Sequence, residues 1–274
     1  MKLLLLAVAV LVLNAGAVSP FQHSVTGATP INATAPDTAT SLDSGEGDVT
    51  PPQSDESAGT IWRVHTERKD IALTFDDGPY PFYTPLLLHV LERSRVPATF
   101  FIVGRSAQEF PELVTRIVES GDEVGNHTFN HYTLTSLDDA EIATQIQSDG
   151  AFLERFTGKP LTLFRPPHGR VNRHVVDIAS ELGYHTILWS AAANDVKDVP
   201  PDVIVSRIMN EAGPGGIILL HSGQFRTIEA LPQIIDDLRA QGYTFVTMSK
   251  LLEDGDNPRS DIETPLLRKR KGRD

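Results

Sequence analysis

Two carboxylates and two imidazoles stand at spacings that suit one metal ion and one general base. Asp76 and Asp77 end an apolar run, and His127 and His131 follow about fifty residues later, four positions apart. A divalent metal ion can make a nucleophile from water near neutral pH, and a carboxylate that is not a ligand can accept the proton. The residue types therefore favour a metal-dependent hydrolase.

Each half of this set also has a simpler explanation. The sequence Asp-Asp-Gly-Pro at 76–79 is typical of a turn, and the two histidines could be ordinary polar residues of a loop. Taken together, they favour a 2-His-1-carboxylate site with open positions for water and substrate. Adjacent side chains at a strand end point to opposite sides, so one aspartate can bind the metal while the other faces the water.

The elements that must position these residues are short apolar strands alternating with amphipathic helices over residues 61–253. Apolar strands with helical crossovers predict a parallel sheet that is buried on both faces. We predict an α/β fold, a distorted or incomplete (β/α) barrel of about seven parallel strands, with its chemistry at the C-terminal ends of the strands. Strands are predicted at 71–75, 97–104, 161–164, 184–190, 217–220 and 243–247, and helices at 81–93, 106–120 (with a capping box of Ser106 and Glu109), 138–156, 172–182, 201–212 and 227–240.

The two ends of the chain differ from this domain in composition. Lys2, an apolar stretch and the small residues before Ala17 predict a signal peptide at 1–17, with an uncleaved anchor as the alternative. Residues 18–60 hold six acidic residues and no Lys or Arg, which predicts a disordered linker. Residues 254–274 form a polar tail with a basic cluster, either solvated or in contact with an anionic wall polymer.

Composition narrows the partners and the compartment. The net charge is −12, of which the linker contributes half, so nothing suggests a nucleic-acid binder. The chain has no cysteine, which excludes disulfides, and the domain must be stable through its own core. We expect a monomer without a stable membrane anchor, either secreted or located in the periplasm or cell wall.

Several ordered motifs resemble those of the polysaccharide deacetylases, the NodB-homology group of carbohydrate esterase family four. Thr-Phe-Asp-Asp-Gly-Pro at 74–79 resembles the first motif, in which the first Asp is the catalytic base and the second binds the metal. The resemblance therefore implies Asp76 as base and Asp77 as ligand. His-Thr-Phe-Asn-His at 127–131 is similar to the second motif, which supplies the metal-binding histidines, His127 and His131.

Two further motifs imply groups that orient the base, contact the substrate and protonate the leaving group. Arg-Pro-Pro-His-Gly at 165–169 resembles the third motif, in which the Arg orients the base and a backbone N–H helps to hold the oxyanion. The family often has Tyr where His168 stands. Leu-Leu-His at 219–221 resembles the fifth motif, with His221 as general acid and Leu219 lining the acetyl pocket. Pro166, His168 and Leu219 are the predicted substrate contacts.

The fourth motif departs from the family pattern. The family often shows Asp-x-x-Asp-Trp after a strand, and here Ala192 and Val196 leave only Asp195 of that set. No metal ligand is missing, so the change bears on substrate contacts more than on the metal. We expect Asp195 to pair with Arg165 beside the base.

The function that the resemblance implies is hydrolysis of N-acetyl groups on a glycan, such as peptidoglycan or a chitin-like oligosaccharide. The products would be a free amine and acetate, and the cofactor would be one divalent metal ion, with zinc the expected one although His and Asp suit several ions. Asp76 would accept a proton from the water and His221 would donate one to the leaving amine. An O-acetyl esterase and a non-catalytic glycan-binding domain are the alternatives.

Overall fold

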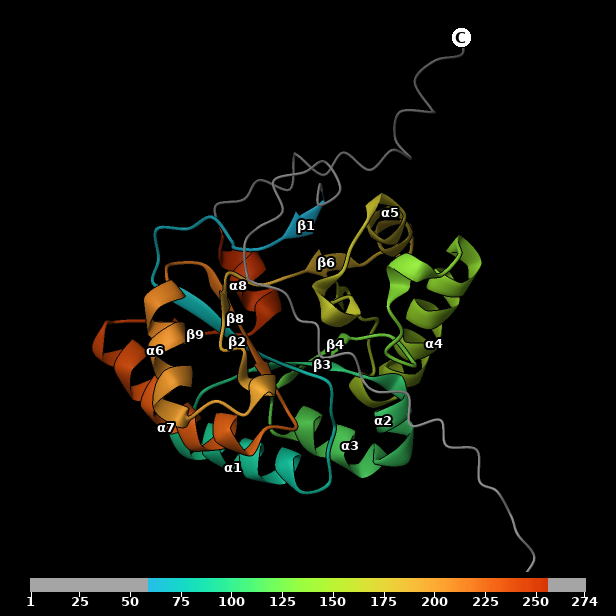
Figure 1. The fold of residues 1–274 in the computed structure, drawn as a ribbon. Coiled ribbons are helices and arrows are strands. Elements are labelled where there is room, and N and C mark those ends of the chain that lie inside the picture. The colour runs from blue at the N-terminus through green and yellow to red at the C-terminus, as the bar shows by residue number, and fades with distance from the viewer. Residues whose placement is uncertain (1–58, 256–274) are drawn as a thin grey trace, which may run out of the picture. The chain divides into compact units, whose positions relative to one another are not determined.

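The computed structural model describes residues 59–255, so the predicted signal peptide, nearly all of the predicted linker and the basic cluster lie outside the described residues. One sheet of nine strands forms the centre, and every ladder between its strands is parallel (Figure 1). The strands are β1 (Thr60–Ile61), β2 (Asp70–Asp76), β3 (Thr99–Ile102), β4 (Glu123–Asn126), β5 (Leu163–Phe164), β6 (His185–Ile187), β7 (Ala191–Ala192), β8 (Gly216–His221) and β9 (Thr244–Phe245).

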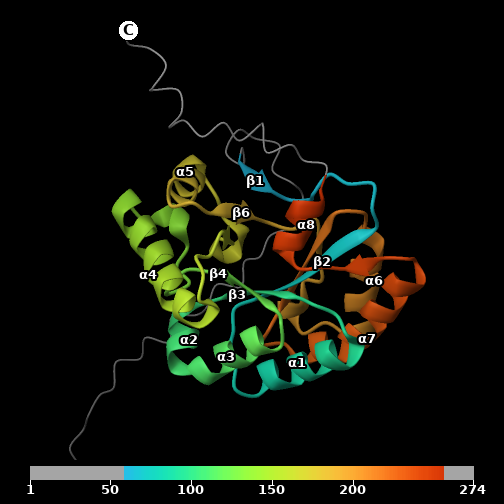
Figure 2. The same cartoon turned by 180° about the vertical axis from the view of Figure 1, so that it is seen from behind.

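Helices surround this sheet, as the front and back views show (Figures 1 and 2). Within the part that the structure describes, none of them is long and apolar enough to cross a membrane. The helices are α1 (Tyr83–Ser94), α2 (Gly104–Glu109), α3 (Pro111–Glu119), α4 (Asp139–Thr157), α5 (Arg173–Glu181), α6 (Pro201–Glu211), α7 (Phe225–Ala240) and α8 (Met248–Asp254), with short 3-10 turns at Leu134–Ser136, Pro167–Gly169 and Asp195–Lys197.

The strand order is β1-β6-β5-β4-β3-β2-β8-β7, and β9 pairs with the first residues of β2. No ladder among the described residues joins β7 to β1, so the barrel is incomplete there. The predicted α/β fold, a distorted or incomplete barrel of parallel strands, is confirmed. Strand β2 lies in the middle of this order, with all seven of its residues buried, and it pairs with β3 and β8.

Side-chain alternation along the strands divides the core into two layers. In β2, Leu73 and Phe75 belong to the larger cluster, which packs against the helices, whereas Ala72 belongs to a second cluster. In β8, Ile217 and Leu219 belong to that same second cluster. Because successive side chains of a strand point to opposite faces, Asp76 and His221 lie on the face of the second cluster, inside the barrel.

Three local predictions need correction. The helix predicted at 106–120 is two helices, because Pro111 lacks the N–H that a continuous helix needs and instead begins α3. Helix α2 starts at Gly104 without a side-chain cap, so the capping box predicted there is wrong, and the structure has one at Asp138 and Glu141. Strand β4 was not predicted, since its sequence, Glu-Val-Gly-Asn, has little apolar content.

Candidate active site

The predicted chemical groups converge at the C-terminal ends of the parallel strands, as expected for a barrel of this kind. Asp76 ends β2 and lies opposite His221, which ends β8, in the register of that ladder. His127 directly follows β4, and Arg165 directly follows β5. Strands far apart in the sequence therefore deliver these side chains to one end of the sheet.

Three side chains form a donor set of the size that one metal ion needs. Asp77 Oδ1 lies 3.2 Å from His131 Nε2 and 3.7 Å from His127 Nε2, and the two Nε2 atoms are 3.2 Å apart. Ligands at about 2.0–2.2 Å from a tetrahedral ion stand roughly 3.3–3.6 Å from one another. These described residues therefore fit a divalent ion through one carboxylate and two imidazoles.

The protonation states suit metal binding as well. Burial lowers the pKa of His127 well below its usual value, so this imidazole is neutral and its Nε2 can be a ligand. Burial would raise the pKa of Asp77, but a hydrogen bond from His131 and the charges of the nearby histidines hold it below its usual range. The set is therefore an ionised carboxylate between neutral donors near neutral pH.

Helix α4 and strand β5 hold the loop that carries the two histidines. His127 Nδ1 lies 2.7 Å from the backbone oxygen of Arg165, which directs its Nε2 toward Asp77. The N–H of His127 donates to the buried carboxylate of Asp149, and the N–H of Asn130 donates to the side-chain oxygen of Gln145. The ligands are thus positioned by contacts made before any ion binds.

Backbone strain is concentrated in the loops of the site. Asp77, Thr128, His131, His168 and Asn194 all have positive φ although none of them is glycine. Such conformations are costly for residues with a side chain and persist where surrounding contacts over-determine them, which happens most often at functional sites. The N–H of His131, for example, donates to the hydroxyl of Thr128 within the loop.

Asp76 is buried and paired with Arg165, in agreement with the predicted roles of base and orienting group. Arg165 Nη1 donates to Asp76 Oδ1 over 2.6 Å and also to the Thr74 hydroxyl, and its guanidinium lies over the ring of Phe101. The other oxygen, Oδ2, lies 3.9 Å from His127 Nε2. Burial raises the pKa of Asp76 to about 6 in spite of the Arg165 charge, so the group is ionised at pH 7 and can accept a proton.

His221 has a different partner from the one expected. Its Nδ1 lies 2.7 Å from Asp195 Oδ1, and its backbone N–H donates to Asp195 Oδ2, which also accepts from the Thr227 hydroxyl. The expected pairing of Asp195 with Arg165 is therefore wrong, because both carboxylate oxygens serve His221 and Thr227. The carboxylate holds the Nδ1 proton and stabilises an imidazolium, leaving Nε2 to act as an acid.

The remaining predicted residues lie beside or behind this centre. The His168 ring is half-buried, with its centroid 4.9 Å from that of His131, which places it next to the metal-ligand set. Pro166 is buried next to Arg165 along the chain. Leu219 is buried inside the barrel two residues before His221. Their roles as substrate contacts stay predictions.

Four supporting residues were missed from the sequence. Asn126 is buried and its side chain accepts from the Thr128 N–H, while Gln145, Asp149 and Thr227 make the contacts described above. A signal existed for two of them, since Gln145 and Asp149 are polar residues one turn apart on the helix face that also buries Ile142 and Ile146.

Comparison with known proteins connects this geometry to a family. The family model for polysaccharide deacetylase matches residues 63–187. A peptidoglycan-N-acetylglucosamine deacetylase of Bacillus cereus is 41% identical over 70% of this chain and 92% of its own length. The chain belongs to the polysaccharide deacetylase family. The recognition made from the sequence motifs is thereby confirmed.

Solved structures of polysaccharide deacetylases share the fold. The peptidoglycan deacetylase PdaC from Bacillus subtilis is 38% identical with a TM-score of 0.64, over 74% of this chain and 97% of that one. A CE4 family pseudoenzyme from Bacillus anthracis is 34% identical with a TM-score of 0.68, over 71% of this chain and 69% of that one. The family thus includes a protein described as a pseudoenzyme, so the residues of the site must decide whether this chain is catalytic.

Proposed function

We propose that the protein is an exported, metal-dependent deacetylase that hydrolyses N-acetyl groups of a cell-wall glycan. The observation that carries the proposal is the joint presence, at one end of the sheet, of a metal donor set, a buried carboxylate and an Asp-paired histidine. Each supplies one requirement of amide hydrolysis. The substrate class follows from the similar proteins, whose names describe deacetylation of peptidoglycan.

Asp77, His127 and His131 would hold the ion, and zinc suits this mixture of imidazole and carboxylate ligands. When bound, a divalent ion lowers the pKa of water and polarises a carbonyl oxygen. Asp76 accepts the proton at Oδ2, because Oδ1 is occupied by Arg165. Arg165 keeps the carboxylate in place and ionised by its charge.

His221 completes the reaction at the leaving group. An amine leaves from a tetrahedral centre only when it is protonated, and an imidazolium is a suitable acid near neutral pH. Asp195 keeps one ring proton on Nδ1, so that Nε2 carries the proton that is donated. The products are acetate and a free sugar amine, and the peptide-like C–N bond is the bond that breaks.

A non-catalytic glycan-binding domain is the second candidate, favoured by the similarity to a pseudoenzyme. The presence of all the groups named above argues against it. A direct test supplies the purified protein with zinc and measures acetate and free amine from N-acetylglucosamine oligomers, alongside acetate from an O-acetylated xylan. Release from the first substrate supports N-deacetylation, release from the second alone indicates an esterase, and release from neither refutes catalysis on acetyl groups.

A further inference from the structure

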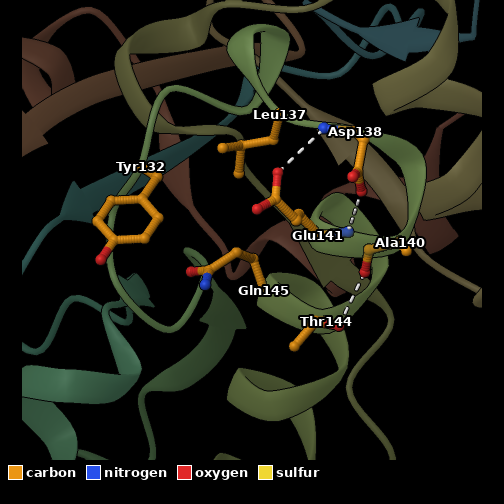
Figure 3. Close-up of a pocket in the computed structure, with 7 residues that line it drawn as sticks. All are labelled: Tyr132, Leu137, Asp138, Ala140, Glu141, Thr144 and Gln145. Atoms are coloured by element: carbon orange, nitrogen blue, oxygen red, sulfur yellow. Dashed lines mark hydrogen bonds between the residues drawn. The ribbon is translucent and has the colours of Figure 1, made fainter.

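A cavity of about 270 Å³ opens beside the loop that carries the metal-binding histidines (Figure 3). Tyr132, which directly follows His131, and Leu137 line one side, while Ala140, Glu141 and Gln145 line it from the first turns of α4. None of these side chains takes part in the reaction proposed above. The cavity is nevertheless joined to the site, because Gln145 also holds the backbone of that loop.

Gln145 presents a fixed hydrogen-bond donor to this cavity. Its side chain is nine-tenths buried, with a residue exposure of 9%, and its oxygen accepts from the N–H of Asn130 over 2.9 Å. Because a backbone N–H can only donate, the oxygen must stand at that position, and the amide nitrogen faces away from the loop. Among the described residues, no acceptor is recorded for this nitrogen, whose two protons are therefore available to a ligand.

The other lining groups complement that donor. Tyr132 offers a half-exposed aromatic face, and Leu137 and Ala140 add a small apolar surface. Figure 3 shows the amide end of Gln145 on the side of the cavity where Tyr132 lies. One oxygen of Glu141 accepts from the N–H of Asp138 in the capping box, which leaves its second oxygen as an acceptor for a hydroxyl.

We propose that this cavity is a subsite for an N-acetylated sugar of the same glycan, next to the sugar that reacts. The proposal rests on the proposed function for the identity of that glycan. An acetamido group offers a carbonyl to Gln145 and a methyl to Leu137 and Ala140, and a pyranose ring stacks its C–H face on Tyr132. The subsite would place the chain relative to the metal site and compensate for the altered fourth motif.

A neutral sugar fits better than a charged group. Asp138 and Glu141 would repel an anion. They also do not form a free cation site, because the side chain of each accepts from the backbone N–H of the other and faces the positive end of the α4 dipole. The ligand is thus distinguished by its acetyl group, and a glucosamine oligomer without acetyl groups should bind this cavity poorly.

The test measures binding by the full chain in the Asp76→Asn background, so that the oligosaccharide is not consumed. The NMR signals of the Gln145 side-chain NH₂ should shift and saturate with the N-acetylglucosamine trimer, and should not move with the glucosamine trimer. Gln145→Glu keeps an oxygen for Asn130 but loses the donor, and should raise the trimer Kd by about threefold to tenfold. Ser148→Ala, an exposed change on the same helix, is the matched control and should keep the parental Kd.

A second pair of variants covers the case in which Gln145→Glu disturbs the loop. Tyr132→Ala should weaken trimer binding, and Tyr132→Phe should retain it. Unmoved Gln145 signals, an equal response to the glucosamine trimer, or parental affinity in Tyr132→Ala would each overturn the subsite, whether or not the protein deacetylates. A trimer that shifts Gln145 in a protein without deacetylase activity would overturn the proposed function alone.

Discussion

Removing the charge of Arg165 tests the assignment of Asp76 as the general base. The two side chains are buried and 2.6 Å apart, and burial raises the pKa of Asp76 to about 6 against the lowering effect of Arg165. A neighbouring opposite charge lowers a carboxylate pKa by about 1–3 units. Arg165→Gln should therefore raise the pKa of Asp76 from about 6 to between about 7 and 9.

The consequence is a displaced acid limb in the pH–rate profile. A base with a pKa of about 6 is roughly nine-tenths ionised at pH 7, whereas pKa values of about 7 and 9 leave roughly one-half and one-hundredth ionised. The acid limb of kcat/KM should move up by about 1–3 pH units, and activity should recover as the pH rises. Acetate release from an N-acetylglucosamine oligomer, measured from pH 5 to pH 10, gives this profile.

Loss of Arg165 also removes hydrogen bonds to Thr74 and to the backbone of Ile187 and Leu188, so the overall rate can fall for structural reasons. The position of the limb, not the height of the profile, is therefore the diagnostic quantity. Arg165→Lys keeps the charge and should leave the limb near its parental position. An unchanged limb in a folded Arg165→Gln variant would refute the reasoning.

The remaining predictions concern the other groups. Asp76→Asn should lower kcat by about 10²–10⁴-fold while metal analysis finds the parental content. His131→Ala should lose stoichiometric metal, and equal metal in variant and parent would contradict its assignment. Asp195→Ala, which removes the partner of His221, should impair acetamides more than activated acetyl esters; equal losses on both would contradict the acid role. Burial raises the pKa of Asp122 from 3.8 to about 6, so stability present below pH 3.8 is lost as the pH rises through 6. Asp122→Asn should therefore raise the free energy of unfolding in urea by about 1–2 kcal/mol at pH 7 and by little at pH 4; an equal gain at both would contradict this.

The sequence was sufficient for the groups whose chemistry depends on residue type and order. Asp76, Asp77, His127 and His131 could be selected because a metal site needs such ligands, and the strand periodicity predicted that they meet at one end of a parallel sheet. Arg165 was paired correctly with Asp76, as its place in the motif implied.

Contacts that depend on packing could not be predicted. Asp195 was assigned to Arg165 because their charges are opposite, but charge does not give distance, and the fold places the carboxylate against His221. Strand β4 escaped prediction because Gly125 stands where apolar content was expected. A side chain there would stand 2.7 Å from the ring of Phe101, so the neighbouring strand requires glycine at that position.

The most direct test of the account is mass spectrometry of peptidoglycan fragments after incubation with the zinc-loaded protein, with the parent and Asp76→Asn compared at equal metal content. The account predicts that the parent removes acetyl groups from sugar nitrogens with release of one acetate for each free amine, and that Asp76→Asn leaves almost all of them in place. Fragments that keep every N-acetyl group in the presence of the parent would contradict it, as would equal deacetylation by the two proteins.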